Sequence, residues 1–283
     1  MFEGLYGLSC VEDQVLAILK ERGNDIAPFY HHSAISLKEL FFFMVIKGES
    51  PYRFSRMPKI QDELKQMEIL DIHLKTPQNM RSVRDKIRNC KENEYVLIRV
   101  TPEFTRAELH ARGFRKDHFV KVTAQEKDFV IYNDIPETTA VITAAKLGKI
   151  YDGEYLLITV KGKVDERLKQ ELWNNRIFKA EKHIPFYFRS YDLEGIENIP
   201  ARMRNMIQVY KIMRCRLAEY YGQYVNTEFV KKSIPMIEKY YAKAEYFNLR
   251  KNATMQQWFE LLHNVNVQDV ELMDTLKGKL EEK

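Results

Sequence analysis

The chain lacks the marks of a membrane or secreted protein. Its longest strongly apolar run, residues 40–46, has seven residues, whereas a helix that crosses a bilayer needs roughly 20. The N-terminus has neither a basic start nor a long apolar stretch before a small-residue cleavage site, so no secretory signal is expected. We therefore predict a cytoplasmic protein without a membrane span.

Cysteine is scarce as well. The 283 residues include only three cysteines, Cys10, Cys90 and Cys215, and no CxxC pair, which argues against a disulfide framework and against a zinc ribbon. Glycine-rich phosphate loops of the Rossmann or Walker type are absent from the sequence. We expect neither a metal site nor a nucleotide cofactor, and one of the cysteines is then a candidate nucleophile.

Glycine and proline are few, at 11 and 9 residues, while 45% of the residues are hydrophobic. This composition is typical of globular proteins and excludes collagen-like and wholly disordered chains. With about 150 residues per domain as a guide, the length predicts two domains. The formal excess of five positive charges is too small to predict nucleic-acid binding, although it favours an acidic protein partner.

The segment from Ser9 to Glu12 has the pattern of a capping box, in which each of the two side chains accepts a hydrogen bond from the other residue's amide. A helix is expected to begin here and to end near Gly23. Cys10 then occupies the first helical position, where the helix dipole favours a thiolate over a thiol. The alternative is a small buried cysteine with a purely structural role.

The next part of the chain changes from helical to strand-like patterns. Apolar periodicity predicts helices at residues 36–45 and 58–67. Runs of β-branched and aliphatic residues then predict strands at residues 94–100, 118–123, 129–132 and 155–160. Helices followed by a sheet predict an α+β domain.

A hairpin is predicted from the strands at residues 118–123 and 129–132, which a polar stretch joins. A three-residue loop at 125–127 places Ala124 opposite Asp128 and, by counting outward, His118 opposite Asp134 on one face. A four-residue loop would put His118 and Asp134 on opposite faces. The alternation of apolar residues favours the three-residue loop.

After residue 161 the composition shifts to helix formers. Helices are predicted at residues 165–182, 201–221, 228–248, 255–264 and 267–279, with Pro235 kinking or dividing the third. Methionine and tyrosine recur at helical spacing in the second of these helices, which indicates core packing or else a partner groove, and which allows a homodimer. We predict one domain at residues 1–163 and a helical domain at residues 164–283.

Cys10, His118 and Asp134 are the residue types of a nucleophilic catalytic triad. A thiol needs a nearby base to become a thiolate, and the base needs a carboxylate that holds its tautomer and stabilises the imidazolium. The predicted helix start, strand start and hairpin bring these three requirements together. We therefore interpret Cys10 as nucleophile, His118 as base and Asp134 as the orienting acid.

Several segments carry a resemblance to a known family: GLSCVEDQVLAILKERG, SRMPKIQDELKQMEI, YVLIRVTPEF, DHFVKVTA, FVIYNDIP, ITAAKL and YLLITV. Through them the stretch from Cys10 to about Val160 resembles the N-terminal domain of the butirosin biosynthesis protein H family. That family is papain-like and is related more distantly to the cysteine peptidase domains that mature bacteriocin leader peptides. The resemblance implies a papain-like fold, with N-terminal helices and an antiparallel sheet, for residues 1–163.

The resemblance also implies an acyltransferase of specialised metabolism, such as antibiotic biosynthesis. In this family the cysteine takes an acyl group from the phosphopantetheine thioester of an acyl carrier protein and passes it to a small-molecule amine. The chain itself would need no cofactor, because aminolysis of a thioester is downhill. Two alternatives remain, a cysteine peptidase or amidase of the same fold, and a non-catalytic interaction protein on the same scaffold.

The oxyanion-binding group differs from the family pattern. Papain-like enzymes usually carry a glutamine six residues before the cysteine, and here that position is Gly4. The oxyanion would therefore rely on the Cys10 backbone amide and a second donor, for which Gln14 and Asn133 are the candidates.

A cationic stretch precedes His118 and contains Arg112, Arg115 and Lys116. Fixed cations suit phosphate recognition, so these side chains are candidates to contact the phosphopantetheine phosphate or an acidic carrier helix. The alternative is an ordinary connection with solvated charges.

Overall fold

The chain forms two compact units, which are described separately. In a computed structural model the described residues are 6–54, 65, 68–77, 79–107, 118–134, 137–174 and 193–282. Unit 1 comprises the described residues within Met1–Ile26 and Ser55–Leu168, and unit 2 those within Ala27–Phe54 and Lys169–Lys283. The predicted helix at residues 58–67 lies outside the described residues except for Lys65.

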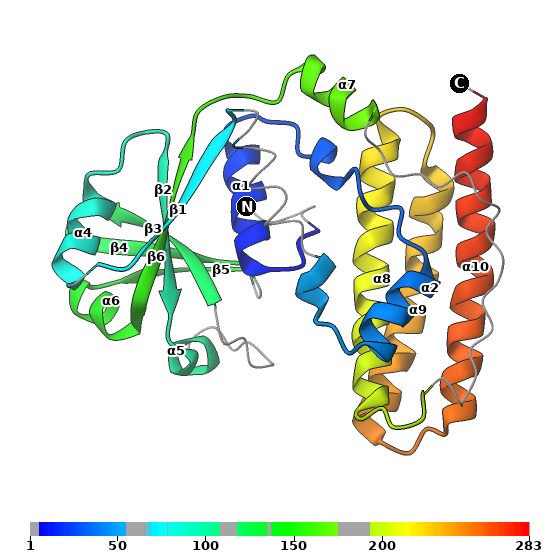
Figure 1. The fold of residues 1–283 in the computed structure, drawn as a ribbon. Coiled ribbons are helices and arrows are strands. Elements are labelled where there is room, and N and C mark those ends of the chain that lie inside the picture. Colours follow the sequence, from blue (N-terminus) through cyan, green and yellow to red (C-terminus); the bar gives the residue numbers. More distant parts are fainter. Residues whose placement is uncertain are drawn as a thin grey trace. The chain divides into compact units, whose positions relative to one another are not determined.

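Unit 1 combines helices with an antiparallel sheet, so it has the predicted α+β architecture. The strands are β1 (Leu70–Lys75), β2 (Glu94–Val100), β3 (His118–Gln125), β4 (Asp128–Asn133), β5 (Thr138–Ile142) and β6 (Tyr151–Val160), and the helices are α1 (Cys10–Glu21), α4 (Met80–Arg88), α5 (Pro102–Ala107) and α6 (Ala144–Ile150). The sheet order is β1-β6-β2-β3-β4-β5 (Figure 1). The four predicted strands correspond to β2, β3, β4 and β6.

The two faces of this sheet carry different helices. On one face an apolar core joins β2, β3, β4 and β5 to Val83 and Ile87 of α4 and to Leu147 of α6. Lys121 alternates with the core residues of β3, so its side chain leaves the sheet on the other face, where its Nζ donates to Glu21 Oε1 of α1 at 2.7 Å. Helix α1 therefore packs against the face opposite that core (Figure 1).

The β3–β4 hairpin has a different register from the predicted one. Gln125 pairs with Asp128, so the loop contains only two residues, and Glu126 takes a φ of +51°, as the first residue of such a loop does. Lys121 pairs with Tyr132, and continuing this count places Asn133, rather than Asp134, on the face of His118. The predicted three-residue loop was therefore wrong, and so was the pairing of His118 with Asp134. A shift of one residue moves every side chain of a strand to the other face.

Unit 2 contains an N-terminal segment as well as the C-terminal helices. The segment forms η1 (Ala27–Tyr30), α2 (Leu37–Leu40), η2 (Phe41–Ile46) and η3 (Pro51–Phe54), and η2 is a π-helix. Phe41, Met44 and Val45 of η2 are buried, and η1 and η2 pack on α8 (Ile199–Gly222). The predicted first domain had included these residues, and burial of their apolar side chains on α8 is the reason that they belong to unit 2.

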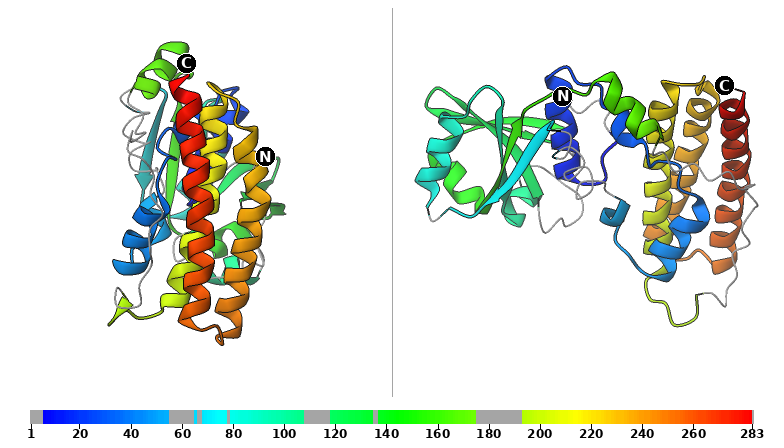
Figure 2. Two further views of the ribbon diagram at one scale, coloured as in Figure 1. Left: turned by 90° about the vertical axis from the view of Figure 1, so that its right-hand side faces the viewer. Right: turned by 45° about the horizontal axis from the view of Figure 1, so that its top comes forward.

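Helices α8, α9 (Glu228–Arg250) and α10 (Met255–Glu281) lie side by side, with α9 packed on both others (Figure 2). Helix α9 continues through Pro235, and α10 is one helix where two had been predicted. Residues 264–267 contain neither glycine nor proline, and Val265 and Asn266 are buried, so the helix has no reason to stop there. The predicted helix at residues 165–182 is described only as α7 (Glu166–Asn174), which crosses the division between the units.

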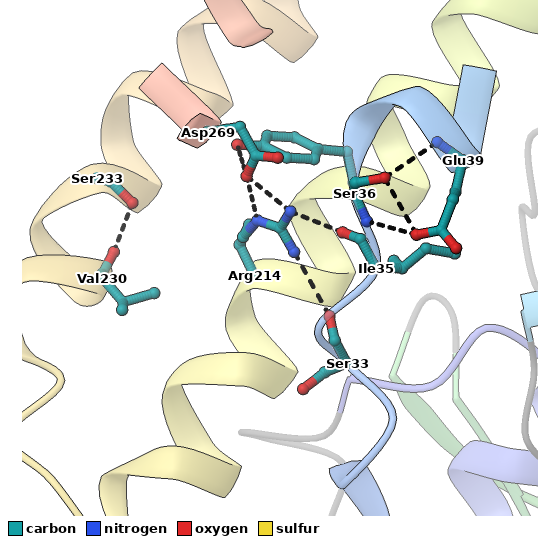
Figure 3. Close-up of polar contacts among 9 residues, drawn as sticks. Ser33, Ile35, Ser36, Glu39, Arg214, Val230, Ser233 and Asp269 are labelled. Carbon is teal, nitrogen blue, oxygen red and sulfur yellow. Dashed lines mark hydrogen bonds and ion pairs between the residues drawn. The ribbon is translucent and has the colours of Figure 1, made fainter. Parts of the chain in front are cut away.

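An ion pair in unit 2 is fully buried. Arg214 of α8 is 0% exposed and donates through Nε to Asp269 Oδ1 of α10 at 2.7 Å. The same guanidinium donates to the backbone oxygens of Ser33 and Ile35 at 3.4 and 2.8 Å, and the Tyr210 hydroxyl donates to Asp269 at 3.1 Å (Figure 3). Burial lowers the pKa of Arg214 and the charge of Asp269 raises it, with a net rise. One charged pair thus joins two helices of the bundle to the N-terminal segment.

The described helices were also compared with the length of a bilayer span. None of the helices in the described part of the chain is both long and apolar enough to cross a membrane.

Candidate functional site

Cys10 is placed by hydrogen bonds at the beginning of α1. The N-cap Ser9 accepts a hydrogen bond through Oγ from the Glu12 amide at 3.1 Å. The buried Glu12 carboxylate accepts one from the Leu8 amide at 2.7 Å. Both contacts satisfy amides near a helix start, which otherwise lack partners. They fix Cys10 as the first residue of the helix, as the sequence predicts.

The turn before Cys10 has room only for glycine. The Asp13 carboxylate accepts a hydrogen bond from the Gly7 amide at 2.8 Å. A Cβ atom on residue 7 would lie 2.1 Å from Asp13 Oδ1, well inside contact distance. The Gly7 position therefore allows a buried carboxylate to hold the backbone that leads into Cys10.

The sulfur of Cys10 lies at the beginning of strand β3. Cys10 is 4% exposed, and its Sγ accepts a hydrogen bond from the Phe119 amide with an N–S distance of 3.5 Å. Phe119 directly follows His118, so residues 109 positions apart in sequence meet at this point. A backbone N–H directed at sulfur favours the thiolate over the thiol.

His118 contacts an amide rather than a carboxylate at hydrogen-bond distance. Its Nε2 lies 2.5 Å from Asn133 Oδ1, whereas Asp134 Oδ1 is 3.7 Å from the same nitrogen. All three side chains are buried. Because an amide oxygen only accepts hydrogen bonds, this contact fixes the proton on Nε2 of the neutral ring. Asn133 thus occupies the orienting position that the sequence assigned to Asp134, and Asp134 adds a nearby negative charge.

Gln14 connects α1 to the end of β4. It is 0% exposed, and its Nε2 donates to the Tyr132 backbone oxygen at 3.0 Å. One of its two amide protons is therefore used for packing α1 on the sheet. Gln14 lies one helical turn after Cys10 and so shares its side of α1. Of the two oxyanion candidates, Gln14 uses one N–H for this contact, whereas Asn133 meets His118 through its oxygen, which is not the group that would bind an oxyanion.

The two other cysteines are poor nucleophiles. Burial raises the pKa of the Cys215 thiol to about 11 and also raises that of Cys90. At neutral pH both side chains are thiols, and the thiol is the unreactive form. Cys10 is buried as well, but it alone of the three lies at a helix N-terminus next to a histidine-bearing strand.

Some residues singled out in the sequence lie outside the described part of the chain. They are Gly4 and the cationic residues Arg112, Arg115 and Lys116. Among the residues that are described, no three or more His, Cys, Asp or Glu side chains are grouped so that they could hold a metal ion.

The contact between Asn133 and His118 was not predicted from the sequence. The correct length of the hairpin loop would have predicted it. A two-residue loop at Glu126 and Lys127 puts Asn133 on the face of His118, and the count follows directly from that loop length. No residue type marks this two-residue loop, because it contains neither glycine nor asparagine, the usual residues at a positive φ.

The chain was also compared with known proteins. No protein-family model matches it, and no curated protein was found to be similar.

Proposed function

We propose that this protein is a cysteine-dependent acyltransferase that forms an acyl-enzyme on Cys10. The observation that carries the proposal is the buried contact of 2.5 Å between His118 Nε2 and Asn133 Oδ1, next to a cysteine whose sulfur is 3.5 Å from the Phe119 amide. A nucleophile, a base and a group that orients the base are the three parts that thiol catalysis needs.

In the proposed first half-reaction, His118 Nδ1 takes the proton of the Cys10 thiol. The thiolate attacks the carbonyl carbon of an acyl thioester, and the tetrahedral intermediate collapses by breaking the carbon–sulfur bond of the donor. The donor leaves as a thiol with the proton from the imidazolium. The Asn133 oxygen holds the ring through Nε2, and the Asp134 charge stabilises the imidazolium.

In the second half-reaction, an amine attacks the acyl group on Cys10 and gives its proton to His118. The intermediate collapses to an amide, and the Cys10 thiolate takes the proton back. The donor that we propose is the phosphopantetheine thioester of an acyl carrier protein, and the acceptor is a small-molecule amine. Both follow from the butirosin biosynthesis protein H resemblance, as does the papain-like form of unit 1, for which the helix–sheet architecture is support.

The proposal is tested by intact-protein mass spectrometry. The protein is incubated with an acetyl thioester of N-acetylcysteamine, a small mimic of the carrier-bound donor, and in parallel with an acetylated carrier protein. We expect an acetyl adduct on the wild-type protein and on Cys215→Ala, and none on Cys10→Ala. An adduct that persists in Cys10→Ala would contradict the proposal.

Adding an amine to the isolated adduct distinguishes transfer from hydrolysis. Transfer predicts that an added primary amine speeds the loss of the acetyl group and is recovered as the amide. A peptidase or amidase would release acetate at a rate that the amine does not change. That result would favour the hydrolase alternative on the same catalytic residues.

The assignment of Asn133 as the orienting residue has its own test. A hydrogen bond to a charged group contributes about 1.5–3 kcal/mol, and about 1.4 kcal/mol is a factor of ten in rate. We therefore expect Asn133→Ala to slow acylation of Cys10 about ten- to a hundredfold, measured as the growth of the adduct with time. Asp134→Asn is the matched comparison, and a larger effect there would make Asp134 the orienting group.

A further inference from the structure

The outward face of α9 carries cations and apolar side chains with no carboxylate between them. Six positions form this outer stripe: Lys232, Met236, Lys239, Lys243, Tyr246 and Arg250. Successive spacings of four and three residues place them within an arc of about 80° over a length of about 27 Å. All six are exposed, with Met236 at 42% and Tyr246 at 53%.

The inner face of the same helix is already occupied. Val230, Ile237, Ala244 and Phe247 are buried, so the apolar stripe that holds α9 in its bundle is separate from the outer stripe. Leu249, at the edge of the outer stripe, is 76% exposed. The exposed apolar side chains of α9 therefore do not contribute to packing α9 in its bundle.

The cations of the outer stripe are not neutralised locally. No carboxylate of the described residues is within ion-pair distance of Lys232, Lys239, Lys243 or Arg250, whereas the neighbouring Lys231 pairs with Glu228 at 3.8 Å. Instead, Lys243 Nζ lies 5.5 Å from the Phe247 ring and Arg250 Cζ 5.6 Å from the Tyr246 ring. Four positive charges along one line therefore attract an anionic surface.

We propose that the outer stripe of α9 binds the surface of a membrane that contains anionic phospholipids. Lysines and arginines grouped on an amphipathic helix attract anionic headgroups, and apolar or aromatic side chains beside them can insert at the boundary of the acyl chains. Met236 and Tyr246 would supply that insertion. Binding of this kind is peripheral and reversible.

The size of the stripe favours a lipid surface over a protein partner. A strip about 27 Å long and about 10 Å wide covers roughly 300 Å², and a standard protein interface buries about 800 Å² on each partner. A bilayer needs no matching shape and can surround a convex helix. A headgroup layer also accepts cations and apolar groups on the same face.

The test is sedimentation of the full chain with vesicles. Vesicles of phosphatidylcholine with about 30% phosphatidylserine are compared with pure phosphatidylcholine, at about 0.1 M and about 1 M NaCl, where the screening length falls from about 10 to about 3 Å. We expect binding to the anionic vesicles at the lower salt, at least tenfold weaker binding at the higher salt, and none to the neutral vesicles.

Two triple variants with the same change in charge locate the site. Lys239→Glu, Lys243→Glu and Arg250→Glu are combined on α9, and Lys91→Glu, Lys127→Glu and Lys149→Glu are combined on exposed positions of unit 1. Circular dichroism first shows that both fold. We expect the α9 variant to lose at least tenfold in affinity and the unit 1 variant to change less than threefold.

Two outcomes would overturn the proposal. Equal losses in both variants would show that net charge, and not the outer stripe, drives binding. Failure of the wild-type chain to bind the anionic vesicles while it binds poly-glutamate through α9 would show that the stripe recognises an acidic protein instead.

Discussion

Replacing His118 with alanine is expected to slow acylation of Cys10 by about 10²–10⁴-fold, the usual contribution of a positioned general base. The buried ring of His118 is held by Asn133 at 2.5 Å, so in the proposed mechanism it is already oriented when the donor arrives. Without it, the thiol loses its proton only to solvent. The rate is measured from the growth of the acetyl adduct on the intact protein.

The dependence of this rate on pH separates a base from a packing residue. In His118→Ala hydroxide must ionise the thiol, so the rate should rise steeply up to the ordinary thiol pKa of about 8.5. The wild-type rate should reach its plateau at lower pH. His73→Ala is the matched control, because His73 is an exposed histidine of the same sheet, and we expect it to acylate as the wild type does. Parallel pH profiles for wild type and His118→Ala would refute the base assignment.

Replacing Asp269 with asparagine is expected to destabilise unit 2 by about 3–5 kcal/mol, because it leaves the Arg214 charge buried without a counter-ion. Arg214 is 0% exposed, and its Nε is 2.7 Å from Asp269 Oδ1 (Figure 3). A domain is stable by only about 5–15 kcal/mol in total, so this single change removes a large share. The Arg214 guanidinium also donates to the backbone oxygens of Ser33 and Ile35. We expect these two hydrogen bonds to weaken in Asp269→Asn as well.

A second ion pair of α8 provides the comparison. Arg204 donates through Nε to Glu245 of α9 at 2.7 Å, but the two side chains are 27% and 28% exposed. Pairs that water reaches contribute about 0.2–1 kcal/mol, so Glu245→Gln should cost no more than about 1 kcal/mol. Urea unfolding measures the loss of stability in both variants. It is followed by the fluorescence of Trp258, which is buried against Phe247 in unit 2. Equal losses would mean that burial of the Arg214 pair carries no extra energy.

The elements that sequence predicted well are those with a strong local pattern. Strand β2 was predicted at residues 94–100 and has those bounds, because EYVLIRV is rich in β-branched, aliphatic and aromatic residues. The N-cap of α1 at Ser9 is likewise local and was predicted, although the Glu12 carboxylate accepts from the Leu8 amide where the predicted capping box has the Ser9 amide. In both cases the determining contacts lie within a few residues of each other.

The elements that were missed depend on distant partners. Strand β1 was missed although LDIHLK alternates strictly between apolar and polar residues, the local pattern of a half-buried strand; it pairs with β6. Strand β5 forms because it pairs with β4, and four of its five residues are exposed. An edge strand such as β5 has a weak pattern, since only one side of it is hydrogen-bonded and little of it is buried.

The sequence predicted which elements carry the candidate residues, but not the contacts between their side chains. Cys10 and His118 follow from residue type and from the elements that carry them. Whether Asn133 or Asp134 shares the face of His118 is decided by one residue of hairpin loop, and the apolar alternation favoured the three-residue loop, whereas a two-residue loop forms. Such a difference is settled by the φ of Glu126, which the amino-acid sequence does not specify.

The division of unit 2 into two stretches of chain has a consequence during synthesis. The segment Ala27–Phe54 leaves the ribosome early, and α8 begins only at Ile199. At about 5–20 residues per second, the intervening chain takes roughly 10–30 s to make. For that time Phe41, Met44 and Val45 have no helix to cover them, which makes the nascent protein a client for chaperones. A gene fragment cut after Leu168 would leave the same side chains uncovered permanently, so excising the part that carries Cys10 and His118 as one piece favours aggregation.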